Sequence, residues 1–419
     1  MRPGEISLES GVDSGPLGAA QITIVVMCAL VAMVDGFDTQ SIALVAPAIA
    51  AAWHEVPARF GLVFGAGLFG GLVGALVFGV GGDRFGRRPA LLAAVALFGV
   101  ATSITPFTAS LTVLAAVRGV TGLGLGGALP TLISLTSEYA PARLRGTLVA
   151  LMFCGFPLGA VMGGIVSAGL IPAFGWKSVF YLGAALPVVL FPILWAVLPE
   201  SARFLAMRQA QSRIRSPVVS LFAHGKAPVT ILLWTTLFLS LLLTYFLVNW
   251  MPMIARQGGI GMTAAVLAVA ALNLGAIVGC LVIGRLCDRY RQATTVIGCA
   301  FGLGALAIAS IGMAKQSVGA LLAATFLAGA LSIGAQMCTV ALCATFYETS
   351  LRVTGVGWAI GMGRIGSIVG PVLGGVLLAA GMAPQSLFAL VGVMSIGSAA
   401  AIVALGRHTR SPGSPEVEI

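Results

Sequence analysis

Two aspartates lie three residues apart in the first long apolar stretch of the chain, within the sequence Asp35-Gly36-Phe37-Asp38. On a helix they share one face, and the length of the stretch places Asp35 near mid-membrane. Repulsion between like charges and removal from water both favour a protonated carboxyl. Carboxyls that gain and lose a proton inside a bilayer are what a proton-coupled carrier needs. The alternative is a purely structural ion pair with an intramembrane arginine.

Only two cations, Arg118 and Arg364, lie well inside apolar stretches and away from their ends. A guanidinium keeps its charge in the membrane, so each needs an anion, either an aspartate or a substrate carboxylate held by two hydrogen bonds. We predict that Arg364 binds the substrate anion, because it lies near mid-depth and its own stretch contains no nearby acid. A structural pair between Arg364 and Asp35 or Asp38 stays open as an alternative.

Several other polar side chains occur in the apolar stretches. They could line a cavity and bind a phenolic hydroxyl, or they could form buried interhelical hydrogen bonds or interfacial anchors. Besides Arg364 and Asp38, the candidates for substrate binding are Tyr245, Asn249, Trp250, Gln336 and Trp358.

A segment rich in glycine and arginine follows the second apolar stretch, and it predicts a cytoplasmic gate. Its acid can cap a neighbouring helix, and its arginines can pair with Glu138, in contacts that form in one state and break in the other. If these arginines only set the orientation of the chain in the membrane, they would need no regular spacing from glycines. A shorter version with Asp288 and Arg289 follows the eighth stretch, and the longer one contains Gly79, Asp83, Arg84, Gly86, Arg87 and Arg88.

The elements that carry these residues must be membrane helices. Of 419 residues, 58% are hydrophobic and 9% charged, with a mean hydropathy of +1.05, which is too little charge for a soluble surface. The 56 glycines fit close helix packing in lipid. Twelve stretches are long enough to span a bilayer: 21–51, 58–82, 89–107, 111–137, 145–171, 176–198, 228–254, 262–285, 293–313, 317–345, 353–380 and 384–405.

A polar segment, 199–227, divides these stretches six and six. The repeated gate segment supports two parallel six-helix repeats with a midplane site between them. We therefore predict an all-α integral membrane protein with two six-helix bundles. The predicted parts are a tail (1–20), the first bundle (21–198), a central loop (199–227), the second bundle (228–405) and a second tail (406–419).

The distribution of cations predicts that both termini are cytoplasmic. With that orientation, few of the 23 lysines and arginines face outward, namely Arg59, Lys177, Arg256 and Lys315. An excess of basic residues on the inner side is the expected asymmetry. The net charge of +10 is therefore an orientation signal, and we reject nucleic acid as a partner.

The sequence offers no sign of enzymatic chemistry. It contains no nucleotide-binding loop, no His-Glu-x-x-His motif and no convincing nucleophile elbow, so transport driven by ATP hydrolysis in this chain is excluded. We predict no metal and no cofactor. The seven cysteines have no metal-ligand spacing and are expected to pack without disulfides. No removable signal peptide precedes the first stretch.

These motifs resemble the major facilitator superfamily over essentially the whole chain, through the two gate segments and Arg118-x-x-x-Gly122. Three further segments resemble its aromatic acid:proton symporter branch, namely Asp35 to Asp38, Gly124 to Pro130 with Ser137-Glu138, and Pro199-Glu200-Ser201. Within that branch, Asn249 to Pro252 and Thr354 to Gly357 look closest to carriers of 3-(3-hydroxyphenyl)propionate. Departing from the pattern, the second gate segment lacks the glycine and the final basic pair, since Arg291-Gln292 follows Tyr290.

The resemblance implies proton coupling or substrate binding for Asp35 and Asp38, and a function for Arg118, Glu138 and Arg364. We assign Arg118 and Glu138 to proton coupling together with the two aspartates. It implies a small hydroxylated aromatic acid and protons as partners, and a functional monomer in the inner membrane of a bacterium. A drug:proton antiporter is the main alternative, although Arg364 at mid-depth is unfavourable for cationic substrates. A sugar carrier, an uncoupled facilitator and a membrane sensor are further alternatives. A facilitator would not need the two aspartates.

Overall fold

The computed structural model describes residues 18–141, 144–200, 221–222, 227–314, 317–343, 345–347 and 352–410, and every regular element in them is helical. It contains twelve helical segments long and apolar enough to cross a membrane, as predicted. They span Ala19–Trp53, Pro57–Gly82, Arg87–Phe107, Leu111–Tyr139, Gly146–Phe174, Lys177–Val197, Ala227–Gln257, Met262–Tyr290, Ala293–Met313, Val318–Cys343, Gly355–Ala379 and Pro384–Thr409. The chain is therefore a multi-pass membrane protein.

The helices form two compact units. Unit 1 comprises Met1–Ser41, Ala66–Gly163 and Phe174–Ser212, and unit 2 comprises Ile42–Gly65, Gly164–Ala173 and Arg213–Ile419. The ends of three helices from the first half of the chain thus belong to unit 2. Phe64, for example, packs edge-on against Trp250 with ring centroids 5.4 Å apart.

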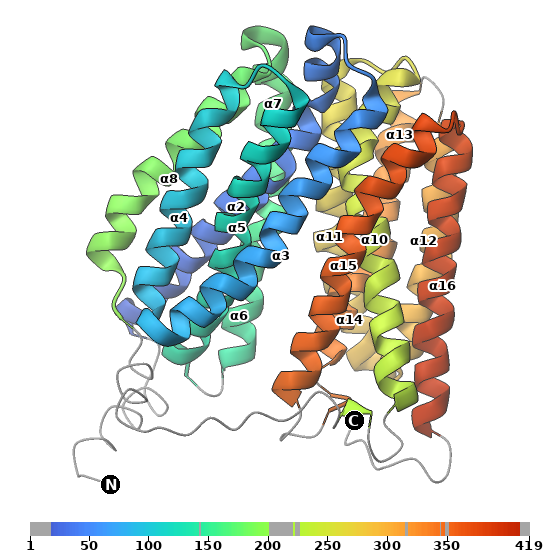
Figure 1. Ribbon diagram of the computed structural model, residues 1–419. Helices are drawn as coiled ribbons and strands as arrows, with labels where there is room; N and C mark the ends of the chain where they lie inside the picture. The colour runs from blue at the N-terminus through green and yellow to red at the C-terminus, as the bar shows by residue number, and fades with distance from the viewer. Residues whose placement is uncertain are drawn as a thin grey trace, which may run out of the picture. The chain divides into compact units, whose positions relative to one another are not determined.

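Unit 1 is built around α4, which packs between α5 and α8 (Figure 1). Proline or a polar cap begins several helices: the hydroxyl of Ser110 accepts a hydrogen bond from the Val113 amide at the start of α5. The helices of this unit are parts of α2 (Ala19–Trp53), α3 (Phe60–Phe85) and α7 (Gly155–Phe174), with α4 (Arg87–Ile104), α5 (Leu111–Tyr139), α6 (Arg145–Phe153) and α8 (Lys177–Val197).

In unit 2, α10 packs against both α15 and α16, and α12 packs along α16 (Figure 1). Its helices are α10 (Ala227–Gln257), α11 (Met262–Tyr290), α12 (Ala293–Met313), α13 (Val318–Ala328), a π-helical turn (Gly329–Ile333), α14 (Gly334–Cys343), α15 (Arg352–Ala379) and α16 (Pro384–Arg410).

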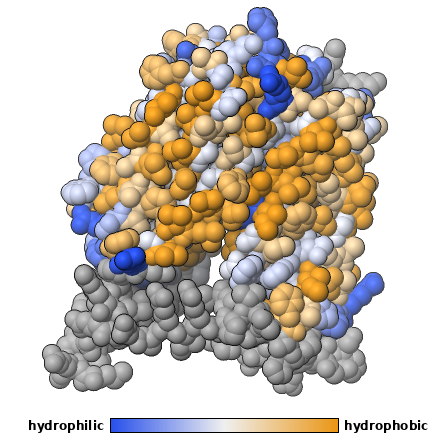
Figure 2. Space-filling model, viewed as in Figure 1, coloured by the Kyte–Doolittle hydropathy of each residue, from blue (hydrophilic) through white to orange (hydrophobic). Residues whose placement is uncertain are grey.

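Each unit has its own hydrophobic core. Leu91, Phe98 and Leu132 are fully buried in unit 1, as are Leu233, Phe301 and Ile402 in unit 2. Apolar side chains also cover the outside: Leu62 is 67% exposed and Leu306 70%. On the face in Figure 2, hydrophobic side chains spread over the helices, and hydrophilic ones gather mainly toward the helix ends. An apolar outer surface of this extent suits contact with lipid.

Several spans contain proline or depart from a regular α-helix. The fifth is divided at Cys154 between α6 and α7, shortly before Pro157. The eleventh differs, because α15 continues through Pro371. The carbonyl of Pro371 accepts a hydrogen bond from the indole of Trp250 at 3.0 Å. Within the tenth span, the π turn interrupts the helix between α13 and α14.

The close packing of α2 against α7 explains why a glycine, Gly36, lies between the two aspartates. A Cβ atom at this position would overlap the backbone carbonyl of Phe156. Gly159 is equally close to the carbonyl of Met33. Glycine therefore lets α2 approach α7 closely enough for backbone contact, which is how small residues join helices in lipid.

Candidate functional site

Asp38 on α2 and Arg118 on α5 form a buried ion pair in unit 1. The guanidinium Nη1 lies 3.2 Å from Oδ1 of Asp38, and Nη2 donates to the Asp38 backbone carbonyl at 2.9 Å. The Asp38 and Arg118 residues are 0% and 3% exposed, respectively. Each charge neutralises the other, which offsets the cost of removing both from water. The predicted requirement of Arg118 for an anion is thus met by Asp38.

Two hydroxyls complete the contacts of Asp38. Thr102 on α4 donates to Oδ2 at 2.9 Å. Ser41, one turn along α2, donates to the Asp38 carbonyl at 2.7 Å and is 3.4 Å from Oδ1. Thr102 was absent from the sequence prediction, because a threonine in an apolar helix usually bonds its own backbone and carries no distinguishing signal.

Asp35 is buried in the same helix, with 2% of its surface exposed. Its Oδ1 atom accepts a hydrogen bond of 2.9 Å from the hydroxyl of Thr39, one turn further along. The two aspartates therefore differ in these contacts. Asp38 is bound by a cation from another helix, whereas Asp35 accepts a hydrogen bond from a hydroxyl of its own helix.

Arg364 lies in the middle of α15 and is half-buried. Its backbone carbonyl accepts from Ser367 at 2.7 Å. Within the described part of the chain, its guanidinium has neither an ion pair nor a hydrogen bond to a side chain. Within unit 1, Asp38 binds Arg118. A cation placed as Arg364 is can accept a carboxylate from outside the chain.

Gln336 on α14 is a second polar group available in unit 2. It is 8% exposed, and among the described residues its amide has no hydrogen-bond partner. It follows the π turn at Gly329–Ile333 by three residues. One extra residue in a turn rotates the next helix face by about 100°, so this turn sets the direction in which Gln336 points.

The remaining polar candidates have local partners. The Asn249 amide donates to the carbonyl of Tyr245 at 2.7 Å, within α10. Trp358 is 45% exposed and stacks on Trp234 with ring centroids 6.0 Å apart. These contacts match the alternative interpretation of an internal helix bond for Asn249 and of an outward-facing anchor for Trp358.

The gate segment is organised by an acid that the prediction did not assign to it. Gly86 has a φ of +112°, which glycine adopts without strain. A carboxylate oxygen of Glu200 accepts from the backbone amides of Arg87 and Arg88 at 2.8 and 3.1 Å. Glu200 therefore caps the N-terminus of α4, where a negative charge is favourable. Asp83 was predicted to provide such a cap, but its side chain lies outside the described residues.

The predicted pairing of the gate arginines with Glu138, in contacts that form in one state and break in the other, stays a prediction, and here Arg84 and Arg88 have other contacts. Arg88 instead donates to the carbonyl of Trp195 and lies over that indole, 5.6 Å from the ring centroid. Arg84 lies over the ring of Phe85 at 5.3 Å. Glu138 accepts from the hydroxyl of Ser134 at 2.8 Å. Aromatic faces in the same unit satisfy these cations, because a guanidinium stacks well on a ring.

The shorter gate segment in unit 2 is different. Asp288 and Arg289 are exposed at the end of α11. Neither has an ion pair with another described residue. Gly79 lies in α3 and Gly284 in α11, each with open space at its Cβ position. The two segments thus share sequence but not contacts.

The described residues contain no cluster of three or more acidic, histidine or cysteine side chains that could hold a metal ion. All seven cysteines are free in this structure.

Comparison with known proteins decides the family. The family model described as Major Facilitator Superfamily matches residues 28–314 and 268–418. The chain belongs to the major facilitator superfamily.

Relatives within this superfamily match almost the whole chain. The gallate transporter of Pseudomonas putida is 38% identical, covering 98% of this chain and 97% of its own. The 4-hydroxybenzoate transporter of Pseudomonas aeruginosa is 36% identical, covering 95% of each. The 3-(3-hydroxy-phenyl)propionate transporter of Escherichia coli is 39% identical, covering 90% and 91%. The resemblance to the aromatic acid branch is thereby confirmed.

A solved structure supports the major facilitator fold. The crystal structure of a D-xylose-proton symporter aligns with a TM-score of 0.75 over 95% of this chain and 98% of its own. The identity of 16% makes this a likeness of fold alone.

Proposed function

We propose that this protein imports a small hydroxylated aromatic carboxylate by proton symport through alternating access. Relatives at 36–39% identity carry names of transporters for gallate, 4-hydroxybenzoate and 3-(3-hydroxy-phenyl)propionate. Each of these is an aromatic ring with a carboxylate and at least one hydroxyl. A site for such molecules requires a cation, an apolar surface and a hydrogen-bonding group.

The observation that carries this proposal is that Arg364 has no ion pair among the described residues. It is a half-buried cation within a membrane helix, and no described residue forms an ion pair with it. A charge at this depth is unfavourable unless it is neutralised. Binding a carboxylate through two parallel hydrogen bonds neutralises it. A cationic drug would instead be repelled, so the antiporter alternative has no support from this residue.

Proton coupling follows from energetics and from Asp35. Moving a monoanion into an inside-negative cell costs about 2.3 kcal/mol per 100 mV. One accompanying proton cancels the charge, and a second makes the potential a driving force. Asp35 is the proposed proton carrier, because its carboxyl is buried within a membrane helix and accepts a hydrogen bond from the hydroxyl of Thr39. Asp38 and Arg118 are proposed to couple the protonation of Asp35 to the arrangement of the helices. Glu138 remains a candidate for the same role.

Gln336 is the proposed partner of the ring hydroxyl, since its amide both donates and accepts. The halves 21–198 and 228–405 are proposed to move as bundles, with the segment from Gly79 to Arg88 and Asp288-Arg289 as the cytoplasmic gate. We further propose a monomer in the bacterial plasma membrane with both termini in the cytoplasm.

Uptake into proteoliposomes tests this function. A panel of hydroxylated aromatic acids is presented while the pH gradient and the membrane potential are imposed separately. We expect accumulation that follows both gradients, and accumulation indifferent to both would refute symport.

Asp35→Asn tests the proton carrier in the same assay. The variant should insert and bind substrate but lose concentrative uptake, because the amide cannot release a proton. Glu55→Gln is the matched control, since Glu55 is ion-paired with Arg59 outside the helix interior. Normal accumulation by Asp35→Asn would remove this residue from the mechanism.

A further inference from the structure

Two cysteines of unit 2 lie side by side on neighbouring helices, Cys280 on α11 and Cys338 on α14. The thiol of Cys338 donates a hydrogen bond to the backbone carbonyl of Cys280, with the sulfur 3.5 Å from that oxygen. The two side chains are also in hydrogen-bonding contact with each other. The fold therefore brings together two nucleophilic groups that are 58 residues apart in the sequence and that the proposed transport mechanism does not use.

Glycines allow the two helices to approach closely enough for this contact. A Cβ atom at Gly334, one turn before Cys338, would lie 2.7 Å from the carbonyl carbon of Gly279 and 2.8 Å from the amide nitrogen of Cys280. A Cβ atom at Gly279 would in turn overlap the carbonyl of Ala330 in the π turn. The backbones are thus in direct contact at the level of the thiols. A disulfide joins Cα atoms less than about 7 Å apart, so helices in such contact suit one.

The two thiols differ in exposure. Cys338 is 9% exposed, whereas Cys280 is half-buried. A small reagent therefore reaches Cys280 first, and Cys338 lies behind it as a second thiol. Cys338 is about 8 Å from the end of α14 at Cys343, so the pair lies toward the helix ends rather than at mid-membrane. An accessible thiol with a resolving thiol beside it is the arrangement found in redox-sensing cysteines.

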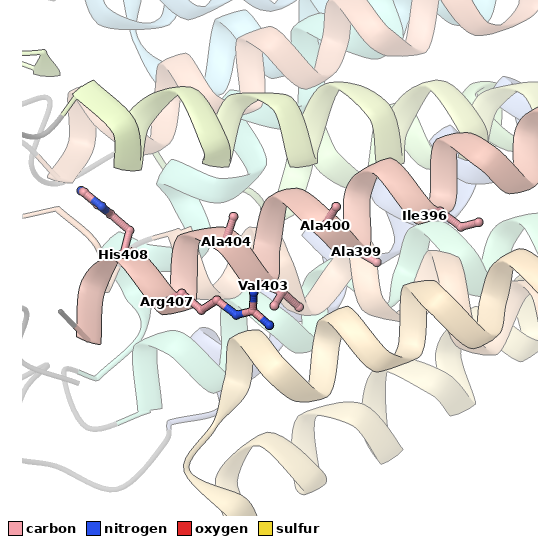
Figure 3. Close-up of a pocket in the computed structure, with 7 residues that line it drawn as sticks. All are labelled: Ile396, Ala399, Ala400, Val403, Ala404, Arg407 and His408. Atoms are coloured by element: carbon pink, nitrogen blue, oxygen red, sulfur yellow. The ribbon is translucent and has the colours of Figure 1, made fainter.

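The other thiols of unit 2 have different surroundings. Cys287 lies on α11 about two turns after Cys280, and its sulfur contacts the carbonyl of Ala293 at 3.9 Å. Cys299 is exposed on α12. The hollow on the outside of α16 has a mainly apolar lining from one helix and contains no cysteine (Figure 3). Within the described part of unit 2, Cys280 and Cys338 are therefore the thiols that contact each other.

We propose that Cys280 and Cys338 are a redox site, which a low-molecular-weight disulfide oxidises to an intramolecular disulfide. The thiolate of Cys280 attacks one sulfur of the external disulfide, and the other half leaves and takes up the proton that Cys280 released. Cys338 then loses its proton and attacks the Cys280 sulfur, releasing the second half as a thiol. The protein loses two hydrogen atoms, and the external disulfide is reduced to two thiols. This reaction does not depend on the proposed transport function.

Reaction of the reduced full-length protein with dipyridyl disulfide tests the site. An isolated thiol such as exposed Cys299 releases one thiopyridone and keeps a thiopyridyl adduct. The pair should release two thiopyridones and keep no adduct, and peptide mapping by mass spectrometry should find Cys280 bonded to Cys338. The second release should not depend on reagent concentration, because that step is intramolecular. Adducts on both cysteines, or no reaction at either, would overturn the proposal.

Three single variants assign the role of each thiol. Cys338→Ser should leave a stable thiopyridyl adduct on Cys280, because the resolving thiol is absent. Cys280→Ser should leave the buried Cys338 unmodified. Cys287→Ser, the matched control on α11, should form the bridge at an unchanged rate. Loss of the bridge in this control, or a bond between Cys280 and Cys287 in the unaltered protein, would show that a different pair reacts and refute the assignment. Because the unaltered protein decides whether the bridge forms, the test does not depend on the folding of any variant.

Discussion

Arg118 in unit 1 and Arg364 in unit 2 each place a guanidinium within a membrane span, and their surroundings differ. Arg118 is 3% exposed and bonded to both the side chain and the backbone of Asp38. Arg364 is half-buried and has no ion pair among the described residues. Removing one partner of a buried ion pair destabilises the fold, because the other charge is left buried without a counterion. A guanidinium without an ion pair in the protein can instead bind an anion.

This difference matters because the two arginines look alike in sequence. Each lies beside glycines in an apolar stretch: Arg118 precedes Gly119, and Arg364 follows Gly363. Their separate roles depend on what other helices bring to them. Four substitutions test the comparison, in order of expected effect.

Arg118→Leu should have the largest effect on stability. It leaves the Asp38 carboxylate buried without a cation, which lowers the free energy of unfolding by about 3–5 kcal/mol. Arg364→Leu, the matched control, should lower it by less than about 1 kcal/mol, because no bond within the described chain is broken. Thermal and denaturant unfolding in one detergent measure both. A second change, Asp38→Asn, should restore part of the loss, and equal losses for the two leucine variants would contradict the comparison.

Arg364→Gln should have the largest effect on binding. The dissociation constant for an aromatic carboxylate is expected to rise at least about thirtyfold, since a buried charge partner is lost. A neutral amide analogue of the same acid should bind as before. Calorimetric titration of both ligands measures the difference, and Arg364→Lys should fall between, having charge but no bidentate geometry. Equal losses for acid and amide would exclude a carboxylate clamp.

Thr102→Val tests whether the Asp38 contacts act as one network. It removes a hydrogen bond to a carboxylate and should lower the free energy of unfolding by about 1.5 kcal/mol. Thr121→Val is the control of identical shape: its hydroxyl bonds the carbonyl of Val117 in its own helix. Unfolding of both variants under the same conditions checks this expectation. No difference between them would mean that Thr102 contributes nothing specific to Asp38.

Gln336→Leu should have the smallest effect, and only on substrates with a ring hydroxyl. The affinity for a hydroxylated acid should fall about fivefold, as loss of one hydrogen bond implies, and benzoate binding should not change. Thr339→Val is the control on the same helix, because its hydroxyl bonds the carbonyl of Ala335. An equal loss for benzoate would place Gln336 outside the hydroxyl site.

The sequence determined the class of the molecule and its candidate charges. Twelve apolar stretches predicted twelve membrane helices, because hydrocarbon admits only backbone that satisfies its own hydrogen bonds. The intramembrane positions of Asp35, Asp38, Arg118 and Arg364 were equally visible, since charges in apolar runs are rare and functional. The motifs also identified the superfamily.

Only the tertiary structure decided which charge meets which. Asp38 could have paired with either arginine, and helix packing brings Arg118 to it together with Thr102 from α4. Packing also assigned the cap of α4 to Glu200, far along the chain, and the contacts of Arg88 to Trp195. Spacing along a helix fixes the face on which a side chain lies. Its partner on another helix depends on how the helices cross, which no local pattern encodes.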